Sequence, residues 1–90
     1  MPAVSRVGDT GSHGGSYIGQ ILSGSSNVQT NGIATAYVGS SYYCPEHGTN
    51  SISSSPVSNV IVDGNAIAVV GSVCVCGAVI DTGSPNVNAN

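Results

Sequence analysis

Short apolar runs separated by glycine, serine and asparagine dominate the chain, and no window of ten residues has the spacing of an amphipathic helix. The apolar residues are mostly Val, Ile and Ala, a composition that favours strands. Asn31-Gly32 and Asp63-Gly64 each separate two such runs, and both dipeptides are typical of the type I′ turn of a β-hairpin. The pattern predicts an all-β fold in which 27–30 pairs with 33–36, and 59–62 pairs with 65–68.

The sequence repeats itself along its length. Val-Gly occurs at Val7-Gly8, Val38-Gly39 and Val70-Gly71, at spacings of 31 and 32 residues. A fixed period in this range indicates a repeat architecture whose units are too small to fold alone. We therefore expect a single domain over 1–90 made of three short hairpin-like repeats, at roughly 1–32, 33–64 and 65–90.

The two ends of the chain are expected to complete the third repeat together. The segment 3–8 matches the second strand of a hairpin, and 86–90 matches a first strand. Pairing them gives a small cone-shaped fold with pseudo-threefold symmetry and little exposed sheet edge. The segments 9–21, 40–54 and 72–83 are then long connections that converge at one end. The apolar stretch 66–80 is predicted to be a buried strand, because it is too short for a membrane span.

The composition indicates that the fold needs a stabilising element in addition to its hydrophobic core. The chain has 90 residues, four Tyr and neither Phe nor Trp. So small a core cannot easily offset the conformational entropy lost on folding, so a metal, disulfides or a partner chain is expected. Tyr37, Tyr42 and Tyr43 are expected to supply part of the missing bulk.

Charge excludes two classes of function. Charged residues make up 6% of the chain and the net charge is −3. The sequence has no Lys and a single Arg, Arg6. Such a chain cannot neutralise nucleic-acid phosphates, and it cannot act as a polybasic membrane anchor. Arg6 is expected either to pair with Asp9 or to orient the protein on a partner.

The candidate chemistry lies in the three long connections. His13, Cys44 and Cys76 each lie five residues after the glycine of a Val-Gly pair, and His47 follows Cys44 by three residues. Together they make a Cys₂His₂ set, which is the nitrogen and sulfur combination that zinc prefers. Cys74 shares a strand face with Cys76 and is the alternative ligand.

A site with four protein ligands leaves no position for substrate or for an activated water. One structural zinc ion is therefore expected, and the protein is predicted not to be an enzyme. A small secreted hydrolase is the weakest alternative, because the sequence has no Gly-x-Ser-x-Gly elbow.

Several motifs, in their order and spacing over essentially the whole chain, resemble the PAAR-repeat family. The strands at the position of the family's Pro-Ala-Ala-Arg sequence are 3–6, 34–37 and 66–69. The motifs are Val4-Ser5-Arg6-Val7-Gly8-Asp9, Ser12-His13-Gly14-Gly15, Cys44-Pro45-Glu46-His47-Gly48, Cys76-Gly77-Ala78 and Gly83-Ser84-Pro85-Asn86-Val87.

The resemblance implies a structural protein that caps and sharpens the trimeric β-helical spike of a contractile injection machine, one copy per trimer. The machine is a type VI secretion system or a phage tail. The tip would assemble in the bacterial cytoplasm, leave on the injection tube or in the virion, touch the target membrane transiently and carry effectors non-covalently. The ligands it implies are His13, Cys44, His47 and Cys76, with the zinc near the point of the cone. Residues expected at the partner contact are Arg6, Asp9, Ala34, Ala36, Tyr37, Ala66, Ala68 and Val69.

A second hypothesis is a free-standing zinc-binding module that oligomerises, or acts in adhesion, through a flat apolar face. It predicts a stable soluble oligomer without a spike, whereas the spike hypothesis predicts a threefold-matched apolar base and aggregation of the protein when it is alone.

Overall fold

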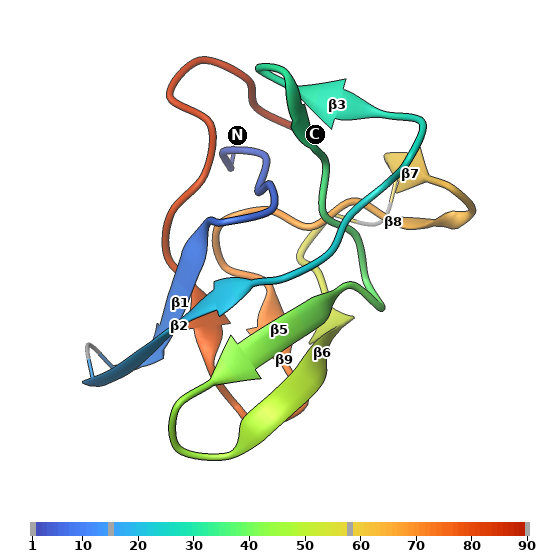
Figure 1. The fold of residues 1–90 in the computed structure, drawn as a ribbon. Coiled ribbons are helices and arrows are strands. Elements are labelled where there is room, and N and C mark those ends of the chain that lie inside the picture. The colour runs from blue at the N-terminus through green and yellow to red at the C-terminus, as the bar shows by residue number, and fades with distance from the viewer. Residues whose placement is uncertain (1, 15, 58, 90) are drawn as a thin grey trace.

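The computed structural model describes residues 2–14, 16–57 and 59–89, and within these ranges it contains strands and no helix. Six antiparallel strands close a barrel in the order β1-β10-β9-β6-β5-β2 (Figure 1). The prediction of an all-β fold is confirmed. The barrel strands are β1 (Thr10–His13), β2 (Ser16–Ile21), β5 (Ser41–Cys44), β6 (Gly48–Ser54), β9 (Val73–Cys74) and β10 (Val79–Ile80).

Two small hairpins lie outside the barrel, and both were predicted. β3 (Gln29–Thr30) pairs with β4 (Ile33–Ala34), and β7 (Ile61–Val62) pairs with β8 (Asn65–Ala66). Their strands are shorter than the sequence indicates. The turns have positive φ at both central positions, with 57° at Asn31 and 52° at Asp63, followed by glycine. This conformation is the reason that the Asn-Gly and Asp-Gly pairs are needed there.

The chain ends pair with each other, as expected. Ala3 forms an antiparallel bridge with Asn88, and the Val4 amide donates to the Val87 carbonyl at 3.0 Å. The N- and C-terminal segments therefore stand in for a third small hairpin, beside β3 at the top of Figure 1.

A ring of three backbone hydrogen bonds marks the pseudo-threefold axis. The amides of Ser5, Ala68 and Ala36 donate to the carbonyls of Ala68, Ala36 and Ser5 respectively, each at 3.0 Å. These three residues occupy the same position in the three repeats. Each therefore satisfies its backbone groups with its two counterparts, and the ring joins the repeats into one unit.

The three segments predicted to be long connections converge at one end as expected, but they are built of strands. The segments 9–21, 40–54 and 72–83 contain the three hairpins of the barrel, β1–β2, β5–β6 and β9–β10. Their strands lack the usual alternation of large apolar residues, because two of the inward positions are glycine. Gly11 and Gly19 are buried in β1 and β2. The stretch 66–80 is also not one strand, since positive φ at Gly71 and Gly77 turns the chain twice.

One large side chain, that of Tyr42, fills the barrel interior, and the other two repeats have smaller residues at the equivalent position. Gly11, Tyr42 and Cys74 occupy equivalent positions three residues after the Val-Gly glycines. A Cβ atom at Gly11 would lie 2.9 Å from Tyr42 Oη, and a Cβ atom at Gly19 would lie 2.7 Å from it. The single tyrosine therefore takes the space that the glycines leave. Around it pack the fully buried Ile21, Ile52 and Ile80.

A second cluster of buried side chains lies between the small hairpins and the paired chain ends. It contains Val4, Val57, Val62, Ile67, Val69 and Ala89. The whole chain measures 29 × 22 × 22 Å along its principal axes. A search of the described residues found no helix of the length and apolar character needed to cross a membrane.

Candidate metal centre

The barrel hairpins bring four of the predicted residues together at one end of the molecule. His13 ends β1, Cys44 ends β5, and His47 and Cys76 lie in the turns after β5 and β9. One ligand atom of each residue lies within 4.8 Å of a ligand atom of every other. These turns lie at the end of the barrel away from the chain termini and β3 (Figure 1).

The distances from the Cys44 sulfur to the two imidazoles are close to those between donors of a tetrahedral metal site. His13 Nε2 lies 3.2 Å from Cys44 Sγ, and His47 Nδ1 lies 3.6 Å from the same sulfur. With metal–sulfur distances of about 2.3 Å and metal–nitrogen distances of about 2.0–2.1 Å, donors of a tetrahedral zinc site lie roughly 3.3–3.8 Å apart. Small movements of the turns would complete this geometry.

The electrostatics of the site favour a thiolate. Burial raises the pKa of the Cys44 thiol, but hydrogen bonds from the side chain and backbone of His47, from His13 and from the Glu46 backbone outweigh it. Together they lower the pKa to about 6. The Glu46 carboxylate lies 3.6 Å from His47 Nδ1 and 3.9 Å from His13 Nε2. A metal ligand must be deprotonated, so this environment prepares Cys44 for coordination.

Glycines with positive φ shape the two turns that contain His47 and Cys76. Gly48 follows His47 with φ of 81°, and Gly77 follows Cys76 with φ of 94°. A side chain at Gly77 would begin 3.8 Å from His13 Cε1. Left-handed backbone at both positions turns the chain sharply, and only glycine adopts it without penalty. The chain therefore changes direction directly after His47 and directly after Cys76.

Cys74 lies outside this group. Its side chain is 2% exposed and packs in the barrel core, whereas Cys76 is half-buried in the turn. Burial, together with the neighbouring thiols of Cys76 and Cys44, raises the pKa of Cys74 to about 12. A buried neutral thiol behaves as a small apolar side chain. The alternative that Cys74 replaces Cys76 is therefore not favoured by the geometry.

The donor set fits a metal ion of intermediate softness. Two imidazole nitrogens and two thiolate sulfurs in tetrahedral reach are the combination found in structural zinc sites. Four protein ligands would leave no open position, so the arrangement suits fastening rather than catalysis. Within the described residues, no other group of three or more His, Cys, Asp or Glu side chains lies close enough to hold an ion.

The residues expected at a partner contact are divided between core and surface. Arg6 lies against Asp9, with Nε 3.1 Å from Oδ2, so the first of the two expectations for its charge describes the structure. Ala36, Ala68 and Val69 have no exposed surface, and their side chains belong to the core. Three others, Ala34, Tyr37 and Ala66, are half-buried.

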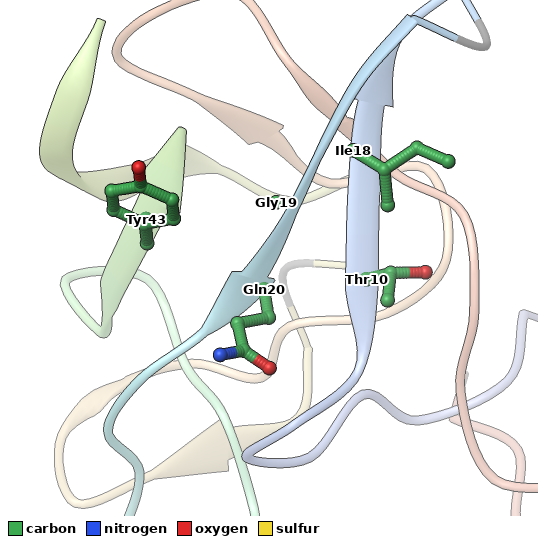
Figure 2. A pocket seen from close by; sticks show the side chains of 5 residues that line it. All are labelled: Thr10, Ile18, Gly19, Gln20 and Tyr43. Atoms are coloured by element: carbon green, nitrogen blue, oxygen red, sulfur yellow. The ribbon is translucent and has the colours of Figure 1, made fainter. Parts of the chain in front are cut away.

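A shallow pocket on the barrel wall has no counterpart in the sequence predictions. Figure 2 shows Gly19 between Tyr43 on β5 and Ile18 on β2, with Gln20 and Thr10 nearby. Among the described residues that line it there is no acid, base or thiol to act on a substrate. The buried glycine in β2 is the only signal that could have indicated it.

Two comparisons with known proteins follow from the sequence. A family model described as the PAAR motif matches residues 7–82, which is most of the chain. No curated protein matches it.

Proposed function

The chain belongs to the PAAR-motif family, and from this membership we propose that it caps and sharpens the trimeric β-helical spike of a contractile injection machine. The family implies a role at the spike tip of type VI secretion and related contractile systems, and its members are structural proteins. The tip would pierce the target membrane through mechanical force supplied by the machine.

One zinc ion held by His13, Cys44, His47 and Cys76 would fasten the three barrel hairpins at the pointed end. Their spacing within 4.8 Å supports this assignment. Each hairpin contributes at least one ligand, so the ion would join all three repeats at the place where the load on a piercing tip is greatest. Bound metal chemistry here would be structural only.

The opposite end, which we call the blunt end, is the proposed docking surface. It consists of the two small hairpins, β3–β4 and β7–β8, and the paired chain ends. Its exposed apolar side chains suit contact with an uncharged partner surface. They are Val28, Ile33, Ile61 and Val87, with exposed fractions of 39%, 39%, 58% and 37%.

The pseudo-threefold symmetry is the observation that carries this proposal. Besides the central ring, the amides of Val28 and Val87 donate to the hydroxyls of Ser25 and Ser84 at 2.9 Å and 3.0 Å, in matching turns. Two of the three corners around the axis therefore share the same turn. A single copy can meet a trimer with each corner facing one subunit, which three copies could not do.

Delivery follows from this position. The protein would assemble on its spike in the bacterial cytoplasm and leave with the injection tube, or with the virion if the machine is a phage tail. Effectors would be carried through non-covalent contacts.

A matched pair of substitutions tests the docking surface. Ile61→Asp at the blunt end should weaken binding to the trimeric spike from the same source by at least about tenfold, because a buried charge opposes association. Ile18→Asp on the barrel wall, at an equally exposed position (62% against 58%), should bind normally. Binding would be measured by co-purification and titration.

Both variants should keep their metal and their melting temperature, which separates docking from folding. Equal binding by the two variants would contradict the blunt end as the interface. A metal-loaded chain that forms a soluble oligomer and ignores the spike would instead favour the free-standing module.

A further inference from the structure

The two thiols of the candidate metal site lie close to each other although they belong to different hairpins. Cys44 belongs to the β5–β6 hairpin and Cys76 to the β9–β10 hairpin, and their sulfurs are within 4.8 Å of each other. All three cysteines are free thiols. Since β6 lies between β5 and β9 in the barrel, a bond between these sulfurs would cross the barrel end.

We propose that Cys44 and Cys76 form a disulfide when the metal is absent, so that the barrel end has a second, oxidative fastening. This inference rests on the position of the two sulfurs and not on spike docking. It deepens the proposed metal site, because the same two side chains would either coordinate an ion or join each other.

Access decides the order of the steps. Cys76 is half-buried in its turn, whereas Cys44 has no exposed surface. A low-molecular-weight disulfide such as oxidised glutathione would therefore meet Cys76 first. The Cys76 sulfur displaces one glutathione thiol and forms a mixed disulfide. The Cys44 sulfur then attacks the Cys76 sulfur, releases the second glutathione thiol and leaves the Cys44–Cys76 bond.

Cys74 is the internal comparison. It is two residues from Cys76 and as buried as Cys44, but its sulfur is not among the four ligand atoms that lie within 4.8 Å of one another. Its place outside this group, and not its burial, distinguishes Cys74 from Cys44. The fold thus selects one of the three pairings that three cysteines allow.

The test uses metal-free protein and oxidised glutathione, with peptide mapping by mass spectrometry. The wild-type chain should lose the mass of two hydrogens and yield a Cys44–Cys76 peptide pair. Cys74→Ala should give the same product. Cys44→Ser and Cys76→Ser should not, and preloading the wild type with Zn²⁺ should slow the reaction at least about tenfold.

His13→Ala/His47→Ala separates this proposal from the metal site. It removes both imidazoles, so it should lose the metal yet still form the Cys44–Cys76 bond. The oxidised metal-free protein should melt about 10–20 °C above the reduced one, because the cross-link restricts the unfolded chain.

A urea-unfolded sample sets the reference for unselected pairing. If metal-free protein in buffer gives the same mixture of pairings as in urea, the proposal is overturned. Stable glutathione adducts at Cys76, or a cross-link through Cys74, would also overturn it. A chain that binds no zinc but forms the predicted bond would overturn the metal site alone.

Discussion

At the scale of single residues, the candidate metal centre depends on which His and Cys side chains reach it. Aligning the Val-Gly pairs placed His13, Cys44 and Cys76 at one position, and the structure brings their ligand atoms together with that of His47. The sequence left Cys74 open as an alternative to Cys76, because the two share a face on any regular strand. The structure separates them because β9 ends at Cys74 and the chain turns before Cys76.

Replacement of one cysteine at a time tests that distinction. Cys76→Ser should lose the metal and about 3 kcal/mol or more of stability, which corresponds to a fall of about 12–24 °C in melting temperature. Cys74→Ala should keep one ion per chain, with a smaller loss from its cavity. Elemental analysis and thermal melting measure both. Metal loss in Cys74→Ala with retention in Cys76→Ser would reverse the assignment.

The role of Tyr42 was predicted only in outline. This residue was expected to supply bulk, and it is indeed fully buried at the barrel centre. Its hydroxyl has no hydrogen-bond partner within the described part of the chain. Burial and the nearby thiols of Cys74, Cys44 and Cys76 raise the pKa of Tyr42, the close approach of the Gly19 backbone lowers it, and the net result is a pKa of about 12. Its hydroxyl is therefore neutral.

Removing this hydroxyl should stabilise the protein. An unpaired buried hydroxyl costs about 1–3 kcal/mol, so Tyr42→Phe should raise the melting temperature by about 4–8 °C or more. Tyr43→Phe is the matched control, because Tyr43 is next in the chain and 43% exposed; it should leave the melting temperature unchanged. A lower melting temperature for Tyr42→Phe would mean that the hydroxyl has a partner.

At the scale of elements, turn chemistry was predictable and barrel strands were not. Asn31-Gly32 and Asp63-Gly64 predict their hairpins because both pairs readily adopt the positive φ of a type I′ turn. The barrel hairpins carry Gly, Ser and Thr where strands usually carry alternating Val and Ile. Gly11 and Gly19 face inward only because Tyr42, from another repeat, fills the space. A long-range contact of this kind leaves no local pattern.

The dependence of β2 on glycine can be measured. A methyl group at Gly19 would lie 1.8 Å from the Tyr43 carbonyl oxygen, so Gly19→Ala should separate β2 from β5. We expect a loss of about 3 kcal/mol. Gly32→Ala is the control: its φ is 78° but nothing lies within 4 Å, so the cost should be about 1–2 kcal/mol. Chemical denaturation compares them, and equal losses would contradict this account of the barrel wall.

At the scale of the whole molecule, three similar units share one backbone ring, one barrel and one candidate metal centre. The period of the sequence and the complementary chain ends predicted this closure. They could not predict that the connecting segments form a barrel, because six short strands gain their hydrogen bonds only from one another. The result has a cluster of His and Cys at one end and an apolar blunt end at the other.

Native mass spectrometry of the chain co-expressed with the trimeric β-helical spike from the same source tests the central claim most directly. The account predicts one complex containing three spike chains, one copy of this chain and one metal ion, in which the ion is lost with Cys76→Ser. A complex with three copies per spike trimer would contradict the match between pseudo-threefold and true threefold symmetry. So would a folded, metal-loaded chain that never joins the spike.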